Sequence, residues 1–250
     1  MPRNEINTKL AMHAAEPLYK QVEKQILNCL AHGEWKPGDR IPTESQLADR
    51  FGVAVLTVRA GIRDLVEANI LVRKQGSGTY VARHDRQRQR YQFTHVFHND
   101  GIKAMPARRL LSFSKAAADK AAAERLMLHA GASVLRIECL MELDGPIATM
   151  EIAVPGRLFA GLTARAIENS QENLYAVYQQ TCGVNVIRIA ERVHAVKAGA
   201  RTARALHIDA DDPVMRIDRI AYTYDDVPVE FRRRIHNAAD FHYELDEGGI

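Results

Sequence analysis

Basic and hydroxyl side chains occur at two places in this sequence where the chain is expected to approach a polyanion. Thr57 and Arg59 fall in the first turn of a helix expected over residues 55–68, and a helix that enters a DNA groove presents this turn to the base edges. Arg73 and Lys74 directly precede the turn sequence Gln75-Gly76-Ser77-Gly78, whose glycines let a hairpin tip approach a surface closely. Thr57, Arg59, Lys74 and the glycine turn predict contacts with nucleic acid, and Arg73 is part of the basic strand edge.

The elements that hold these side chains are predicted from helix caps and hydrophobic spacing. Thr43 stands three residues before Gln46, which is the spacing of a capping box and marks the start of a helix. Gly52-Val53 predicts a short turn, and the segments on either side of Gly76 predict a hairpin. Helices over residues 17–33, 43–51 and 55–68 and a hairpin over residues 70–81 are therefore expected, in the order of a winged helix-turn-helix.

Charge is unevenly distributed along the 250 residues, whose formal net charge is +3. The first 90 residues hold 15 Lys and Arg against 10 Asp and Glu, whereas residues 91–250 hold 19 against 21. The N-terminal excess agrees with a polyanionic partner for that part of the chain, and an ordinary solvated surface is the alternative interpretation.

The composition is that of a globular chain. Hydrophobic residues make up 46% of it, and it has no run of about eighteen apolar residues. Neither a membrane span nor a signal peptide is therefore expected, and the cytoplasm is the expected location. Cys29, Cys139 and Cys182 share no short spacing, which predicts buried thiols rather than a disulfide framework or a zinc site.

The N-terminal stretch resembles the GntR family of bacterial transcription regulators. The segments that carry the resemblance are Pro17-Leu18-Tyr19, Gly33 through Pro42, Thr43-Glu44, Leu47-Ala48, Phe51-Gly52-Val53, Thr57-Val58-Arg59 and Gln75 through Val81. The resemblance implies double-stranded DNA as the partner, and electrostatics adds two residues of the hairpin to the contacts that it implies. The predicted DNA-binding residues are Arg40, Thr43, Ser45, Leu56, Thr57, Arg59, Lys74, Gly76, Ser77 and Gly78.

The sequence departs from the family pattern at the start of the second helix of the motif. Ala54 and Val55 stand where the family usually has Ser-Arg or Thr-Arg, and Ser45 stands where many relatives have an arginine. Two arginines that face the groove are thus missing, and each bidentate guanine contact contributes about 1–3 kcal/mol of discrimination. The operator sequence of this protein therefore cannot be inferred from the operators of its relatives. Either Val55 and Leu56 contact a thymine methyl group or the protein binds DNA more weakly.

A polar segment, His84 through Arg90, separates the two halves of the chain. It has alternating arginines and no apolar period, which predicts a solvated connector. We therefore expect a DNA-binding domain over residues 15–83, a linker over residues 84–90 and a second domain over residues 91–248.

The second domain is predicted to be an antiparallel sheet with flanking helices, which makes the chain α+β. A short amphipathic helix is expected around Phe93, Val96 and Phe97, ending at Asp100-Gly101. Turn sequences at Asp144-Gly145-Pro146 and Asp225-Asp226 each predict a hairpin. Strands are expected over residues 106–113, 133–143, 147–154, 186–197, 213–224 and 227–236, and helices over residues 116–128, 162–167, 173–180 and 200–206.

The order of these elements and Pro228-Val229-Glu230 resemble the UTRA effector domain of HutC-type GntR regulators, whose fold is akin to chorismate lyase. The resemblance implies a homodimer and a small-molecule effector bound on the sheet. Cys139 and Met141 replace the Arg-x-Arg pair of members that sense sugar phosphates, so a sugar phosphate is not expected. The predicted effector-binding residues are Thr94, His95, Arg136, Glu151, Glu230 and Arg232.

The predicted function is a repressor that binds an inverted-repeat operator as a dimer and is released by a metabolite. The alternatives are an enzyme that uses Glu151 or Glu230 as acid or base, and a DNA-binding protein without an effector. The sequence has no phosphate-binding GxxxxGK[ST] loop and no GxSxG elbow. His95 and His98 have no third ligand at a suitable spacing. No catalytic residue, cofactor or metal is therefore expected.

Overall fold

The computed structural model describes residues 16–83, 95–100, 106–170 and 174–244. The chain divides into two compact units, residues 1–83 and residues 84–250. The predicted connector over residues 84–90, Thr94 and Leu245 lie outside the described residues.

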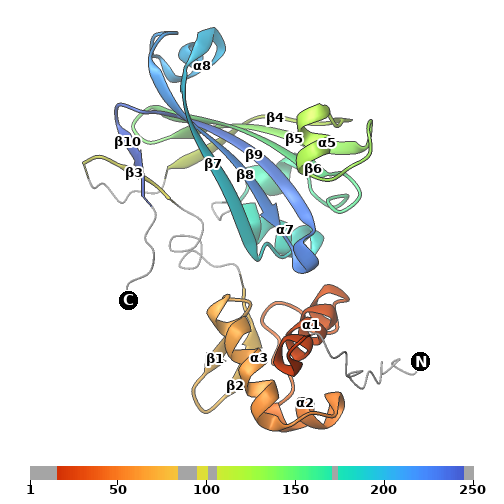
Figure 1. Ribbon diagram of the computed structural model, residues 1–250. Helices are drawn as coiled ribbons and strands as arrows, with labels where there is room; N and C mark the ends of the chain where they lie inside the picture. Colours follow the sequence, from red (N-terminus) through yellow and green to blue (C-terminus); the bar gives the residue numbers. More distant parts are fainter. Residues whose placement is uncertain (1–15, 84–94, 101–105, 171–173, 245–250) are drawn as a thin grey trace. The chain divides into compact units, whose positions relative to one another are not determined.

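The described residues of the first unit form three helices and a two-stranded hairpin (Figure 1). They are α1 (Leu18–Ala31), α2 (Glu44–Phe51), α3 (Val55–Glu67), β1 (Leu71–Lys74) and β2 (Gly78–Val81). Thr43 caps α2 in a complete capping box with Gln46, and Gly52 ends that helix in the left-handed conformation, with φ of 69°. The predicted winged helix-turn-helix is confirmed.

The core of this unit lies between the helices and the hairpin. A Cβ atom on Gly61 of α3 would lie 2.9 Å from the carbonyl oxygen of Tyr19, so the glycine allows α1 and α3 to pack closely. The buried apolar residues recur at helical spacing, which is why each helix buries one face. They include Val22, Ile26, Leu30, Leu47, Phe51, Val58, Ile62 and Leu65.

The second unit is built on a six-stranded antiparallel sheet with the strand order β4-β5-β6-β9-β8-β7. The strands are β4 (Ala107–Ala117), β5 (Ser133–Glu142), β6 (Pro146–Pro155), β7 (Arg188–Lys197), β8 (Pro213–Tyr222) and β9 (Pro228–Asn237). The helices are α5 (Lys120–Arg125), α6 (Ala164–Glu168), α7 (Leu174–Cys182) and α8 (Gly199–Leu206), with a short 3-10 turn η1 (Tyr224–Asp226). Both predicted hairpins and the α+β class are confirmed.

The two faces of the sheet are covered differently. One face packs against α6 and α7, and its buried apolar cluster includes Ile137, Ile152, Phe159 and Tyr178. The opposite face carries α5 and α8 over two smaller apolar clusters. The α7 face therefore holds the larger core of the unit.

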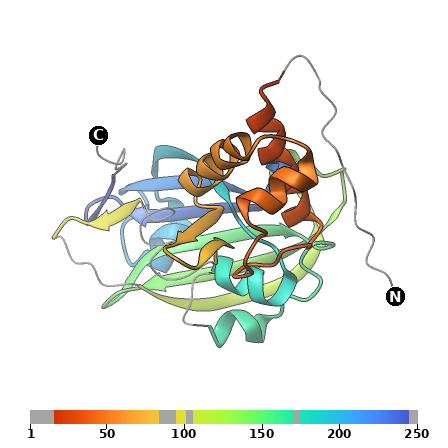
Figure 2. The ribbon, with the colours of Figure 1, turned by 90° about the horizontal axis from the view of Figure 1, so that it is seen from below.

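The prediction of a short helix around Val96 and Phe97 is wrong for the residues that the structure describes. Val96–His98 is strand β3, which pairs with β10 (Phe241–Tyr243) in a separate two-stranded ribbon beside the sheet (Figures 1 and 2). Pairing with a segment more than 140 residues away decides this structure, and three apolar residues are too few to distinguish a helical period from a strand.

The alanine-rich segment is helical over a shorter range than predicted. Strand β4 continues to Ala117, and α5 extends only over Lys120–Arg125. Asp119 caps this helix by accepting a hydrogen bond from the backbone N–H of Ala122 at 2.8 Å.

Candidate nucleic-acid interface and ligand site

A single carboxylate joins three elements of the first unit. Glu44 in the first turn of α2 accepts a hydrogen bond from Arg59 Nε at 2.8 Å and another from Arg73 Nη2 at 3.1 Å. Arg59 lies on α3 and Arg73 on β1. The start of α2, the first turns of α3 and the hairpin therefore lie next to one another.

Exposed apolar side chains accompany these charges at the start of α3. Leu56 is 72% exposed, and Val55 is also exposed. Ala54, at the N-cap, makes no side-chain hydrogen bond to the first turn of α3. This end of the helix can thus offer methyl groups, backbone N–H groups and the Arg59 guanidinium to a ligand.

The hairpin holds basic side chains near its glycine turn. Lys74 Nζ lies 4.5 Å from the centroid of the Tyr80 ring, whose hydroxyl is 2.7 Å from Ser77 Oγ. A Cβ atom on Gly78 would lie 2.7 Å from Arg40 Nε, so the glycine leaves room for the Arg40 side chain. Gly78, with φ of 123°, and Gly76, with φ of 69°, both have backbone conformations that favour glycine.

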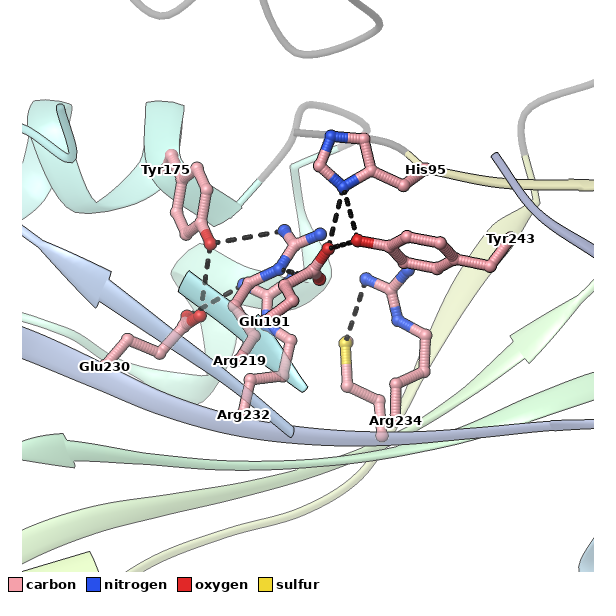
Figure 3. Close-up of polar contacts among 9 residues, drawn as sticks. His95, Tyr175, Glu191, Arg219, Glu230, Arg232, Arg234 and Tyr243 are labelled. Atoms are coloured by element: carbon pink, nitrogen blue, oxygen red, sulfur yellow. Dashed lines mark hydrogen bonds and ion pairs between the residues drawn. The ribbon is translucent and has the colours of Figure 1, made fainter. Parts of the chain in front are cut away.

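The second unit concentrates buried charge on the α7 face of its sheet (Figure 3). Residues directly opposite one another on antiparallel strands share a face. Ile152, Arg232, Arg219 and Glu191 stand in one such row across β6, β9, β8 and β7. The row is apolar at β6 and charged from β9 to β7.

Glu230 is held entirely by protein donors. It has no exposed surface, and it accepts hydrogen bonds from Tyr178 Oη at 2.7 Å, Tyr175 Oη at 3.3 Å and Arg232 Nη2 at 2.8 Å. These contacts occupy most of the acceptor positions of the carboxylate. Glu230 therefore fixes the position of Arg232.

Glu191 connects the sheet to the β3–β10 ribbon. Its carboxylate accepts from Arg219 Nε at 2.6 Å and Tyr243 Oη at 2.6 Å, and it lies 2.7 Å from His95 Nδ1. Burial opposes ionisation of Glu191, but these partners outweigh it and lower the pKa of the carboxyl below its usual range. Glu191 is therefore an anion that ties the ribbon to β8.

Arg234 has a different environment. Its nearest polar contact among the described residues is the Met150 sulfur, 3.9 Å from Nη2. Burial, together with Arg219 and Arg232, lowers the pKa of the Arg234 guanidinium to about 9. The group is a cation that the described residues do not neutralise.

Comparisons with known proteins follow the same division of the chain. Residues 18–81 match the family described as "Bacterial regulatory proteins, gntR family", and residues 103–242, more than half of the chain, match the UTRA domain. The chain belongs to the GntR family and carries a UTRA domain. The predicted resemblance is thereby confirmed.

Several relatives of this GntR protein are repressors that match it over most of both chains. The mannosyl-D-glycerate transport/metabolism system repressor MngR of Escherichia coli is 29% identical, covering 92% of this chain and 95% of that protein. The repressor PhnF of Mycolicibacterium smegmatis is 31% identical, covering 88% of each chain. The histidine utilization repressor of Klebsiella aerogenes is 28% identical over 82% of this chain and 85% of that protein, in agreement with the HutC-type branch.

A solved structure supports the fold of the UTRA domain. The ligand-binding domain of a GntR-family transcriptional regulator from Bordetella bronchiseptica is 29% identical, with a TM-score of 0.59. The match covers 62% of this chain and 97% of that domain. The antiparallel sheet with flanking helices is therefore the fold of this part of the family.

The residues predicted to contact DNA in this GntR protein are all at least partly exposed. Eight of the ten are exposed, and Thr57 and Gly78 are intermediate. Arg40 and Thr43 precede α2, and Ser45 lies in its first turn. The others lie in the first turns of α3 and on the hairpin. Glu44 and Arg73 belong to the same surface but are absent from the predicted set. The acidic Glu44 gave no signal for DNA, whereas Arg73 was recognised only as part of a basic strand edge.

The residues predicted to bind an effector do not form one site. His95, Glu230 and Arg232 belong to the charged cluster of the α7 face. Arg136 and Glu151 lie on the opposite face, because they alternate along their strands with the core residues Ile137 and Ile152. On that face Arg136 donates a hydrogen bond to Asp119 at 2.6 Å, and Glu151 forms an ion pair with Arg201 at 3.0 Å. The prediction of a single pocket that contains both Glu151 and Glu230 is therefore wrong.

Sequence reasoning missed further members of the cluster on the α7 face. The residues concerned are Tyr175, Tyr178, Glu191, Arg219, Arg234 and Tyr243. One signal was present in the sequence: the run Arg232-Arg233-Arg234 lies in a strand, where alternation places two arginines on one face.

The thiols and histidines have varied surroundings. Cys139 is buried as predicted, whereas Cys29 and Cys182 are partly buried. Burial raises the pKa of the Cys29 and Cys139 thiols to about 11. His98 packs edge-on against the Phe241 ring and, unlike His95, does not contact Glu191.

Two further properties of the described residues concern metal binding and membranes. No group of three or more His, Cys, Asp or Glu side chains in this part of the chain is arranged to hold a metal ion. Among the same residues, no helix has the length and apolarity needed to cross a membrane.

Proposed function

We propose that this protein is a repressor that binds an inverted-repeat operator in double-stranded DNA as a homodimer. The observation that carries the proposal is the surface of the first unit, where Arg59, Arg73 and the exposed start of α3 adjoin the glycine-tipped hairpin. A recognition helix and a wing in this order bind the major groove and the adjacent backbone. The protein then acts in the cytoplasm, where bacterial DNA lies.

A dimer follows from the size of this surface. One unit of about 65 residues makes fewer contacts than nanomolar specificity requires, and two-fold symmetry doubles them. The inverted repeat is the DNA counterpart of that symmetry. Light scattering of the protein, alone and on DNA, is expected to give a mass of twice the 28.0 kDa chain, and a single-chain mass in both measurements would contradict the dimer.

We further propose that a small metabolite binds the second unit and releases the operator. A ligand shifts an equilibrium only if it binds the two states with different affinity. A typical coupling free energy of about 1–3 kcal/mol lowers DNA affinity about 5- to 150-fold. The test is a gel shift of the operator with candidate metabolites, in which unchanged DNA affinity in the presence of a bound ligand contradicts release.

The family and the relatives favour this function over the alternatives. The family consists of bacterial regulatory proteins, and the relatives MngR and PhnF are named as repressors. An enzyme with a lyase-like fold would convert a candidate metabolite, and product analysis of the incubated protein distinguishes it. A DNA-binding protein without an effector would show no thermal shift with any metabolite.

A further inference from the structure

A small cavity lies between the β3–β10 ribbon and the strands β7, β8 and β9. Its space is about 230 Å³, counting the part that is open to solvent, and the enclosed part has room for about one water-sized group. It suits a single small polar group at the end of a ligand. The lining residues are His95, Val96, Glu191, Ile217, Arg219, Arg232 and Arg234.

Three arginines around this cavity face only two carboxylates. Arg219 pairs with Glu191 at 2.6 Å, and Arg232 pairs with Glu230 at 2.8 Å. No carboxylate among the described residues lies within ion-pair distance of Arg234, whose polar contact is the weakly accepting Met150 sulfur. The cavity therefore carries an excess of one positive charge.

Two guanidinium nitrogens at this cavity also lack an acceptor. Nε of Arg232 and Nε of Arg234 are both buried and have no hydrogen-bond partner among the described residues. The Arg232 side chain is fixed by Glu230, and the residue as a whole is only 6% exposed. Buried polar groups are normally hydrogen-bonded, and buried charges are normally paired. Two unpaired N–H donors, one of them on the uncompensated Arg234 guanidinium, favour an anionic oxygen as ligand.

We propose that this cavity binds the carboxylate group of a small ligand, with Arg232 and Arg234 as its guanidinium donors. This inference rests on the proposed function, because it takes the ligand to be the effector that releases the operator. A monoanion neutralises the single excess charge, whereas a phosphate dianion leaves one negative charge uncompensated in a confined space. The ligand also lies against His95 and Val96 of the ribbon, so its binding acts on the segment that follows residues 84–94.

The test compares ligands that differ in charge but hardly in shape. Thermal unfolding of the full chain is measured with propionate, with its neutral amide propionamide and with inorganic phosphate, each at matched ionic strength. At about tenfold above a millimolar Kd, propionate is expected to raise the Tm by about 3–6 °C, more than phosphate, whereas propionamide has no effect.

Variants assign this response to the cavity. Arg234→Met is expected to remove the propionate shift while keeping or raising the Tm of the ligand-free protein, because the variant removes a partly buried charge that has no carboxylate partner among the described residues. Arg234→Lys keeps a cation and is expected to retain part of the shift. The control is Arg192→Met, which removes one exposed charge from the opposite face of β7 and is expected to leave the propionate shift unchanged.

Four results overturn the inference: no shift with propionate, an equal shift with propionamide, a larger shift with phosphate, or a propionate shift that survives in Arg234→Met. Operator binding by the same preparations is measured in a gel shift. If the protein binds its operator but fails the propionate test, the ligand class is wrong and the repressor function stands. If it binds no DNA specifically, the proposed function fails.

Discussion

Arg59 of the first unit and Arg232 of the second have opposite environments. Arg59 is exposed and held by Glu44, whereas Arg232 is buried and held by Glu230. An exposed ion pair contributes little to folding because water screens it, so Arg59 can exchange Glu44 for DNA at low cost. A buried pair has lost its hydration and depends on both partners.

Arg59→Ala is expected to weaken operator binding more than tenfold and to leave the fold intact. The guanidinium lies on the exposed side of α3, and loss of one bidentate base contact costs about 1–3 kcal/mol. A gel-shift titration measures the change. Arg204→Ala removes an exposed helical arginine from the second unit and serves as the matched control, and equal affinities of the two variants would exclude Arg59 from the interface.

Glu230→Gln is expected to destabilise the second unit by about 3 kcal/mol or more, because it leaves Arg232 buried without its carboxylate. Chemical denaturation followed by circular dichroism measures the loss. In Glu151→Gln the affected pair is formed with Arg201, which is 74% exposed, so a cost of about 1 kcal/mol or less is expected. Equal losses in the two variants contradict the buried role of Glu230.

His236 is expected to make the second unit sensitive to mild acid. Burial, aided by Arg234, lowers the pKa of this imidazole well below its usual range. Below pH about 6.5 the unfolded chain gains a proton that the folded chain does not, so the free energy of unfolding falls by up to about 1.4 kcal/mol per pH unit.

Unfolding titrations between pH about 4.5 and 6.5 test this effect, because most carboxylates titrate below that window. His236→Gln is expected to flatten the pH dependence. His129→Gln replaces an exposed histidine and is expected to leave it unchanged. An unaltered slope in His236→Gln would show that other groups cause the acid sensitivity.

Among the elements of the first unit, we expect the hairpin β1–β2 to contact the DNA phosphates. Lys74→Ala is expected to weaken binding to all DNA sequences similarly and to lower the slope of log K against log salt by about one unit. Gel shifts at several salt concentrations measure the slope. Lys24→Ala on α1 is the control, and identical slopes in both variants contradict the role of the hairpin.

Local sequence signals predicted the elements that depend on local chemistry. The capping box at Thr43, the glycine that ends α2 and the turns at Asp144 and Asp225 each specify a backbone conformation within a few residues. The bounds of the strands on either side of these turns were accordingly predicted to within a few residues. The α+β fold followed from their order.

Elements that depend on distant pairing were not predictable in this way. Strand β3 is specified by Phe241–Tyr243, far along the sequence. The charged cluster depends on register, since Arg219 meets Arg232 and Glu191 only when three strands are aligned. Glu151 was assigned to the same pocket as Glu230 from the family resemblance, and a position in a strand does not by itself reveal which face of the sheet the residue shares with a neighbouring strand.

At the scale of the whole molecule, the two units divide the proposed work. The first unit has an exposed basic surface, and the second has a small cavity with an excess cation next to the β3–β10 ribbon. Each unit has its own core. In the proposed mechanism, a ligand in the second unit influences the first through the chain between them or through the proposed dimer.

Specific recognition of an inverted repeat through the α3 surface is tested by sequencing the genomic DNA fragments that the purified protein retains. We expect the enriched fragments to share an inverted repeat with half-sites about one helical turn, or a multiple of it, apart. We also expect that Arg59→Ala, assayed in parallel, does not enrich them. Fragments without a shared repeat, or equal enrichment by both proteins, would contradict recognition through this surface.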